Sequence, residues 1–218
     1  MARWAVFDMD GTLLPGDSLE GIFMRHALRA RLLPAWNVVA FILACLRDRD
    51  VWDAFRRDKT YLTGLSVSVV EKYAQSLFTR FILPALSPDG LRVMEERRRD
   101  HAVMVMTGAP DFLTRHLSEA SAIDRAVCTM PEVCNGRYTG GIVGLHPYGE
   151  RKRDILLALR NKLDIDFARS IVYANHHSDI PHMELFGEAV VVNPTVRLRW
   201  HARRHGWAVA SWSRRRRD

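Results

Sequence analysis

The pattern of apolar positions predicts four short strands that alternate with helices. Short continuous apolar runs that end in small or polar residues are typical of strands buried on both faces of a parallel sheet. Such runs occupy residues 4–7, 102–106, 170–173 and 189–192. Helix signals follow at residues 87–94, 110–117 and 151–163. This alternation predicts an α/β fold, a doubly wound, Rossmann-like parallel sheet whose ligands bind beyond the carboxyl ends of the strands.

The pattern changes between the first and second predicted strands. Apolar residues recur there at helical spacing, without a strand signal. The predicted helices cover residues 19–28, 38–46, 51–57 and 69–81. We therefore predict a helical cap, residues 15–86, inserted after the first strand into a core formed by residues 1–14 and 87–218. A small hairpin is also predicted within residues 134–143, because Asn135-Gly136 is a typical tight-turn pair.

Two carboxylates, Asp8 and Asp10, stand directly after the first predicted strand and before Gly11. In an extended chain their side chains point to one side, and the glycine lets the backbone turn sharply, so one acid can attack while the other handles protons. Acids this close also attract a hard divalent cation, normally magnesium. The alternative is an ordinary strand-to-helix turn with a capping aspartate. The apolar strand before the pair and the Gly-Thr-Leu after it favour the catalytic interpretation.

The stretch Val-Phe-Asp-Met-Asp-Gly-Thr-Leu-Leu, residues 6–14, resembles the first motif of the haloacid dehalogenase superfamily. The helical insert and the closing stretch at residues 190–207 resemble subfamily IB, which contains phosphoserine phosphatase. The resemblance implies a phosphomonoesterase that uses Mg²⁺ and an aspartyl-phosphate intermediate. It implies Asp8 as the nucleophile, Asp10 as the general acid and base, and a small phosphorylated metabolite as the substrate.

The resemblance places the second and third motifs in order along the chain. An apolar run ends in Thr107 and Gly108, where a hydroxyl and backbone amides are expected to hold phosphate at a helix N-terminus. A threonine at this point is also an ordinary helix cap. Lys152 is the expected third motif, a point charge that holds phosphate against the nucleophile. Its neighbours Arg151 and Arg153 are the alternatives.

The fourth motif matches only in part. The family usually has Gly-Asp-Ser after a late strand, whereas residues 174–176 read Ala-Asn-His and Asp179 keeps the second acid. The resemblance implies that Mg²⁺ is held by Asp8, the backbone carbonyl of Asp10, Asn175 and Asp179. An amide oxygen still coordinates a hard cation, but the lost negative charge is expected to weaken binding.

Substrate contacts are expected from the cap, whose polar candidates are Asp17, Arg56, Arg57 and Lys59. Phosphoserine phosphatases place a glutamate shortly after the first motif, and the corresponding stretch here contains Asp17, so amino-acid specificity is not carried over. The apolar stretch at residues 36–43 suggests an alternative substrate, a lipid phosphate such as phosphatidylglycerol phosphate. A helix packed inside the cap is the commoner explanation of such a run.

Two further alternatives stay open. The altered fourth motif and the arginines at residues 214–217 are compatible with a degenerate, non-catalytic member that binds anions. Three histidines of one predicted loop suit zinc, iron or nickel, although their spacing is irregular and no cysteine lies near them. These are His176, His177 and His182.

Composition narrows the partners without selecting a substrate. The net charge is +7, which favours anionic partners. Aromatic residues are not interleaved with the arginines as base stacking requires, so no nucleic acid is expected. The longest apolar run, residues 32–46, is shorter than the roughly 20 residues of a spanning helix, which leaves only peripheral membrane contact open. The oligomeric state is not determined by the sequence.

Cysteine usage and the chain start indicate a cytoplasmic location. The three cysteines, Cys45, Cys128 and Cys134, are odd in number and lack paired spacings. We expect them to be buried thiols in a reducing compartment. No secretory signal opens the chain, because its first apolar run leads straight into Asp8 and Asp10.

Overall fold

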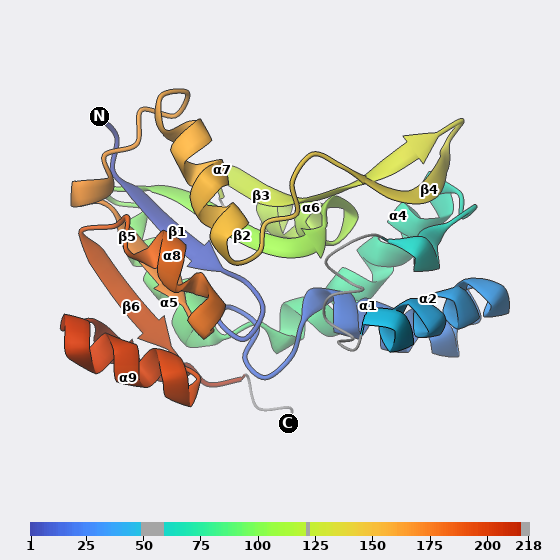
Figure 1. Cartoon of the computed structure of the whole chain (residues 1–218), viewed down its shortest axis with the longest axis horizontal. Coiled ribbons are helices and arrows are strands. Elements are labelled where there is room, and N and C mark those ends of the chain that lie inside the picture. Colours follow the sequence, from blue (N-terminus) through green and yellow to red (C-terminus); the bar gives the residue numbers. More distant parts are fainter. Residues whose placement is uncertain (49–58, 121–122, 215–218) are drawn as a thin grey trace.

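The computed structural model describes residues 1–48, 59–120 and 123–214. Within these residues the strands form one sheet in the order β4-β3-β2-β1-β5-β6-β7, parallel except for β4 (Figure 1). Their bounds are β1 (Trp4–Asp8), β2 (Ala102–Pro110), β3 (Arg125–Cys134), β4 (Arg137–Val143), β5 (Ile171–Ala174), β6 (Glu188–Val192) and β7 (Ala208–Ala210). The predicted α/β sheet is confirmed, and all four predicted strands belong to it.

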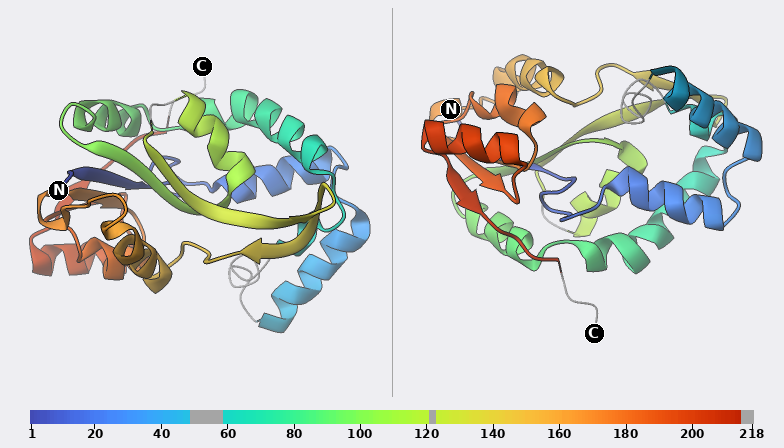
Figure 2. Two further views of the ribbon diagram at one scale, coloured as in Figure 1. Left: turned by 90° about the horizontal axis from the view of Figure 1, so that it is seen from above. Right: turned by 60° about the horizontal axis from the view of Figure 1, so that its bottom comes forward.

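Helices cover both faces of the sheet, as the two views in Figure 2 show. On β1, Ala5 and Phe7 join the apolar cluster that includes residues of α5 and α6, whereas Trp4 and Val6 join the cluster with residues of α7, α8 and α9. Successive strand residues point to opposite faces, so a continuous apolar run supplies both clusters. The bounds are α5 (Pro88–Arg97), α6 (Asp111–Ala120), α7 (Glu150–Arg160), α8 (Ile180–Met183) and α9 (Val196–His205).

The predicted cap region contains helix after helix and lies at the far end of the long axis from the N-terminus (Figure 1). Its elements are α1 (Leu19–Arg29), α2 (Ala35–Asp48), η1 (Thr60–Leu62), α4 (Val67–Leu77), η2 (Phe78–Ile82) and η3 (Leu83–Ala85). The predicted helix at residues 51–57 lies outside the described residues. The exact limits of cap and core stay a prediction.

The hairpin of β3 and β4 joins the core sheet to the cap. The turn is at Asn135-Gly136, where both residues have positive φ, as the sequence predicted. The Gly140 carbonyl accepts a hydrogen bond from the Lys59 amide, and the Tyr138 carbonyl accepts one from Gly64. The hairpin is longer than predicted, because β3 also runs parallel to β2 as a core strand.

Two sequence predictions about single residues have different outcomes. Ser87 caps α5 as expected, because its hydroxyl accepts a hydrogen bond from the Gly90 amide and Pro88 occupies the first turn. The prediction of buried thiols is wrong for Cys134, which is exposed at the end of β3, and Cys128 is only half-buried. The side chain of Cys45 is outside the described set. None of the described helices is long and apolar enough to cross a membrane.

Candidate active site

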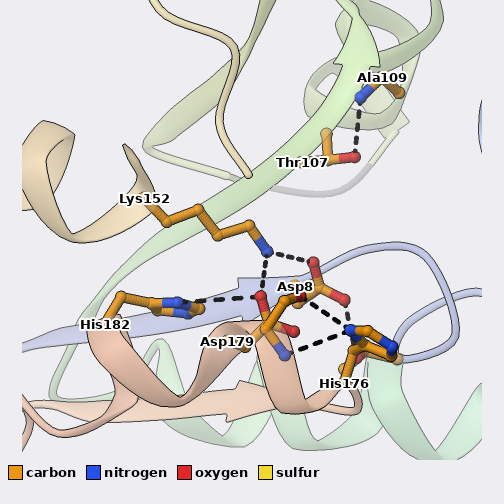
Figure 3. Close-up of polar contacts among 9 residues, drawn as sticks. Asp8, Thr107, Ala109, Lys152, His176, Asp179 and His182 are labelled. Atoms are coloured by element: carbon orange, nitrogen blue, oxygen red, sulfur yellow. Dashed lines mark hydrogen bonds and ion pairs between the residues drawn. The ribbon is translucent and has the colours of Figure 1, made fainter. Parts of the chain in front are cut away.

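Polar side chains from three separated segments contact one another at the carboxyl end of the central strand, and a fourth segment ends beside that strand. Asp8 is the last residue of β1, which lies between β2 and β5 and pairs Asp8 with Met106. Thr107 follows Met106, and the fourth-motif residues follow β5. Parallel neighbours end at one edge of the sheet, so three motifs are brought together by strand order alone. Figure 3 shows Thr107, Asp8 and Asp179 around this edge, with Lys152 reaching in from α7.

Lys152 connects the nucleophile position to the late acid. Its Nζ donates to Asp8 Oδ1 at 2.7 Å and to Asp179 Oδ1 at 2.9 Å, with all three side chains buried (Figure 3). Burial lowers the pKa of the ammonium, but Asp179 and Asp8 raise it above its ordinary value. Arg151 and Arg153, the alternatives on the same helix, are exposed. Of the three cations, Lys152 is therefore the one that contacts the acids.

Asp8 is buried with a hydrogen-bond partner for each oxygen. Oδ1 accepts from Lys152 and Oδ2 accepts from the Thr12 hydroxyl at 3.0 Å. Burial raises the pKa of Asp8 to about 6, with Asp179 adding to the rise and Lys152 opposing it. The two hydrogen bonds fix the rotation of the carboxylate, which leaves it oriented for attack in one direction.

The side chain of Asp10 lies beside the N-terminus of α1, the first helix of the predicted cap. Its Oδ1 accepts a hydrogen bond at 2.9 Å from the amide of Leu19, the first residue of α1. Burial raises the pKa of Asp10 to about 7, and the charges of Asp8 and Glu20 add to the rise. A carboxyl that titrates near neutral pH is suited to both donating and accepting a proton.

The raised pKa of Asp10 predicts a pH-dependent stability difference for Asp10→Asn. An acid whose folded pKa exceeds its unfolded value of 3.8 stabilises the fold below that value and loses this contribution as pH rises through about 7. In EDTA at pH 8 we expect the variant to be about 1–3 kcal/mol more stable than wild type, and nearly equal at pH 4. Denaturant unfolding at both pH values measures this. A difference that does not change with pH would contradict it.

Asp179 stays ionised in the same pocket. Burial alone raises its pKa, but Lys152 and His182 hold it below the ordinary value. His182 lies 3.8 Å away, and burial lowers its own pKa to about 3, so its imidazole is neutral at pH 7. The attraction that keeps Asp179 charged therefore comes chiefly from Lys152.

Asn175 packs directly on the turn of the first motif. A Cβ built at Gly11 would lie 2.0 Å from Asn175 Nδ2, and Gly11 has φ +80°. Only glycine fits there, both because of the left-handed backbone and because the amide occupies the space. The amide of the altered fourth motif is thus held beside Asp10 by the glycine turn.

If Asn175 holds Mg²⁺, as the resemblance to the haloacid dehalogenase superfamily implies, replacing Gly11 by Ala should weaken Mg²⁺ binding. The added methyl group displaces the amide, and we expect the apparent Mg²⁺ affinity in the hydrolysis assay to fall about 10-fold or more. Gly16→Ala is the matched control, because Gly16 has φ +70° and no atom within 4 Å of a built Cβ. It carries the same backbone strain without the clash. Equal Mg²⁺ dependence of the two variants would refute the role given to Asn175.

The residues present fit a hard divalent cation. When Asp8, Asp10 and Asp179 are all ionised, three carboxylates face one ammonium, which leaves two negative charges uncompensated in a largely buried site. Carboxylate, amide and backbone carbonyl oxygens are the ligands that Mg²⁺ prefers. In the described part of the chain no three His, Cys, Asp or Glu side chains are grouped so as to hold a metal. The transition-metal alternative therefore has no support there, and a Mg²⁺ site would also need the Asn175 amide and the Asp10 backbone carbonyl as ligands.

Thr107 and Gly108 lie near the carboxyl end of β2, where the pairing of β2 with β3 shifts register between Met106 and Pro110. The Thr107 hydroxyl accepts a hydrogen bond from the Ala109 amide at 3.1 Å (Figure 3). Two residues that the sequence did not indicate lie behind this part of β2: Thr129 on β3 and the buried His146. Neither belongs to a motif, and a lone histidine between predicted elements gave no signal.

The cap candidates are engaged in ion pairs. Lys59 is fully buried and donates to both oxygens of Glu20 at 2.8 and 2.9 Å, and the Tyr61 hydroxyl also donates to Glu20. Asp17 accepts from Arg25 at 2.7 Å and from Arg214 of the C-terminal tail at 3.1 Å. Substrate contact by Lys59 and Asp17 stays a prediction. Arg56 and Arg57 lie outside the described residues.

Comparison with known proteins agrees with this geometry. Residues 5–184 match the family described as haloacid dehalogenase-like hydrolase. "Phosphoserine phosphatase SerB1" of Mycobacterium tuberculosis is 26% identical over 94% of this chain and 69% of its own length. "Histidinol-phosphatase" of Neisseria meningitidis is 25% identical over 97% of this chain and 100% of its own length. A solved structure of a phospho-aspartyl intermediate analogue of phosphoserine phosphatase covers 100% of this chain and 95% of its own, with 16% identity and a TM-score of 0.63.

The chain therefore belongs to the haloacid dehalogenase-like hydrolases, which confirms the resemblance read from residues 6–14. The match extends from β1 to α8 and so includes all four motif positions. The solved structure shares the fold, and its low identity carries no further conclusion about substrate.

Proposed function

We propose that this hydrolase is a Mg²⁺-dependent phosphomonoesterase that acts through an aspartyl-phosphate on Asp8. The observation that carries the proposal is the buried contact of Lys152 with both Asp8 and Asp179, at the sheet edge where Thr107 follows the β2 residue that pairs with Asp8. It gives one nucleophile, one phosphate-directed cation and one hydroxyl donor at the same strand edge. The family match and the phosphatase names of two relatives support the same reaction class.

The positions of the side chains support the following reaction. An Asp8 oxygen attacks phosphorus and the bond to the leaving alcohol oxygen breaks, while Asp10 gives that oxygen a proton. Asp10 then takes a proton from water, which cleaves the acyl phosphate and releases inorganic phosphate. In the proposed complex Lys152 and Thr107 donate to the phosphoryl oxygens, where charge stabilisation is worth a few kcal/mol per contact.

Asp8, the Asp10 backbone carbonyl and Asn175 would hold Mg²⁺, with Asp179 nearby. The bound cation supplies charge neutralisation between a carboxylate nucleophile and an anionic phosphate. The amide at position 175 replaces the family's usual carboxylate, so a weaker metal affinity than in close relatives is part of the proposal.

Hydrolysis of para-nitrophenyl phosphate with Mg²⁺ and with EDTA tests the proposal directly. We expect turnover that requires the cation. A panel of soluble phosphomonoesters, including phosphoserine and histidinol phosphate, then ranks substrates by kcat/KM. No cation-dependent turnover of any member, from a folded protein, would refute the function and favour the non-catalytic alternative. A cytoplasmic location remains a prediction.

A lipid phosphate is the second candidate substrate, because one side of α2 is exposed and apolar. Trp36, Val39, Ile42 and Leu43 are 68%, 54%, 51% and 60% exposed. Three- and four-residue spacing places them on one side of the helix. Vesicle flotation with phosphatidylglycerol membranes distinguishes the two, since an enzyme of soluble substrates stays in the aqueous fraction.

A further inference from the structure

A series of three hydrogen bonds, called the relay below, runs behind residues 107–109 of β2 and ends on Thr107. His146 Nδ1 lies 2.7 Å from the Thr129 hydroxyl, and this hydroxyl donates to the Gly108 carbonyl at 2.7 Å. The same peptide unit carries the Ala109 amide, which donates to the Thr107 hydroxyl at 3.1 Å. Three hydrogen bonds and one peptide unit thus connect a histidine of the β4–α7 connection to the second motif.

The hydrogen bonds of the relay can be assigned donors and acceptors in one consistent direction. The Thr129 hydroxyl has a single proton, which it gives to the Gly108 carbonyl, so Nδ1 of His146 must donate to Thr129. The Thr107 oxygen accepts from the Ala109 amide, so its own proton is directed elsewhere. Every group therefore donates toward the motif, and Thr107 is the final donor.

The residues of the relay lie in the protein core. Thr107 and Thr129 are each 1% exposed, and His146 is 4% exposed. A Cβ built at Gly108 would lie 2.8 Å from Cε1 and 2.9 Å from Nε2 of His146, so the imidazole packs directly against the backbone of β2 at this residue. Any larger residue at 108 would push the ring away. The packing and the hydrogen bonds fix the same peptide from two directions.

We propose that His146 and Thr129 are positioning residues that orient and strengthen the Thr107 hydroxyl as a phosphate donor. This inference rests on the proposed function, in which Thr107 binds the phosphoryl group. A hydrogen bond accepted by a carbonyl polarises the peptide and makes its amide a stronger donor, so successive bonds reinforce each other in a dry interior. The amide in turn holds the Thr107 oxygen, so the hydroxyl proton is aimed in one direction before substrate arrives.

The relay and Lys152 are also close together in the sequence, because the connection from β4 to α7 carries His146 and ends at the helix of Lys152. The Tyr148 amide donates to the His146 carbonyl, and the Lys152 amide donates to the Gly149 carbonyl. The segment that carries His146 therefore leads directly into the first turn of α7, which carries Lys152. One short stretch of chain contains both a group that acts on the Thr107 hydroxyl and the ammonium proposed to bind phosphate.

A double-mutant cycle on Thr129 and Thr107 tests the relay. Thr129→Val removes the relaying hydroxyl with little change of shape, and Thr129→Ser is the matched control that keeps it. We expect Thr129→Val to lower kcat/KM for para-nitrophenyl phosphate about 10-fold, as outer hydrogen-bond partners commonly do, and Thr129→Ser to match wild type. In a Thr107→Val background Thr129→Val should have no further effect, because the final donor is already gone.

Substitutions of His146 provide a second test of the relay. His146→Phe keeps the ring volume without a donor and should behave like Thr129→Val. His146→Asn keeps an N–H near the Nδ1 position and should recover part of the rate. Inorganic phosphate affinity, measured by calorimetry, should fall in parallel for Thr129→Val and His146→Phe, and thermal unfolding checks that each variant is folded.

The outcomes separate the relay from the function. Additive losses in the cycle, or equal rates and equal phosphate affinity for the valine and serine variants, would overturn the relay in an enzyme that remains active. If wild type binds inorganic phosphate but shows no turnover, the proposed function fails. The relay is then decided by whether Thr129→Val weakens phosphate binding only when Thr107 is present.

Discussion

Asp8→Asn should abolish hydrolysis while the protein stays folded. The amide is isosteric with the carboxylate but is not a nucleophile, so we expect kcat to fall by at least about 10⁴-fold, as for other covalent catalysts that lose their nucleophile. Thr12 and Lys152 surround the side chain, and the amide oxygen still accepts one hydrogen bond. Steady-state hydrolysis with Mg²⁺ measures the loss, and circular dichroism checks the fold.

Asp154→Asn is the matched control, because Asp154 lies exposed on α7. It should keep the wild-type rate. An acid-quenched wild-type reaction should also carry a phosphate adduct on the peptide that contains Asp8, and the Asn variant should not. Full activity of Asp8→Asn, or an adduct on another residue, would rule out Asp8 as the nucleophile.

Lys152→Met should have the second largest effect, on stability as well as on rate. The ammonium is the shared partner of Asp8 and Asp179, and without it two buried carboxylates lose their counter-charge. Breaking a buried ion pair from one side typically costs about 3–5 kcal/mol of unfolding free energy. Loss of a direct charge contact to the phosphoryl group should lower kcat about 10²–10³-fold. Denaturant unfolding at pH 8 and steady-state kinetics measure the two effects.

Two controls show whether the stability loss comes from the buried charge at position 152 or from any loss of charge on α7. Arg151→Met and Arg153→Met change exposed cations on either side and should stay within about 0.5 kcal/mol of wild type. The double variant Lys152→Met with Asp179→Asn should regain part of the lost stability, because one of the uncompensated acids is removed. An equal loss for all three cations, or no recovery in the double variant, would contradict the arrangement.

The site explains how an altered fourth motif is accommodated. Asn175 is packed against Gly11, and Asp179 is kept ionised chiefly by Lys152. In the proposed function the Asn175 amide offers the cation a neutral oxygen ligand, while Asp8, Asp10 and Asp179 remain as carboxylates. We therefore propose that Mg²⁺ affinity is weaker than in relatives with an acid at this position, and that the reaction itself is unchanged.

Strong local patterns were sufficient for most of the fold. The run at residues 4–7 supplies both faces of a central strand, and such a run has few alternatives in a chain with alternating helices. Ser87-Pro88 fixed the start of α5 for the same local reason. The strands β3 and β7 were missed because their exposed positions interrupt the apolar pattern. Whether such a segment forms a strand depends on the strands that pair with it, and a short stretch of sequence does not show which strands these are.

The sequence by itself determined the family, the sheet and the order of the four motifs, because each rests on residues adjacent in the chain. Only the tertiary structure decided that Lys152 and not Arg151 or Arg153 reaches the acids, since one residue's step rotates a helix side chain by roughly a quarter turn. It also brought Thr129 and His146 behind Gly108, from segments with no motif of their own. Contacts between distant segments depend on how strands and helices pack, and local sequence does not encode that packing.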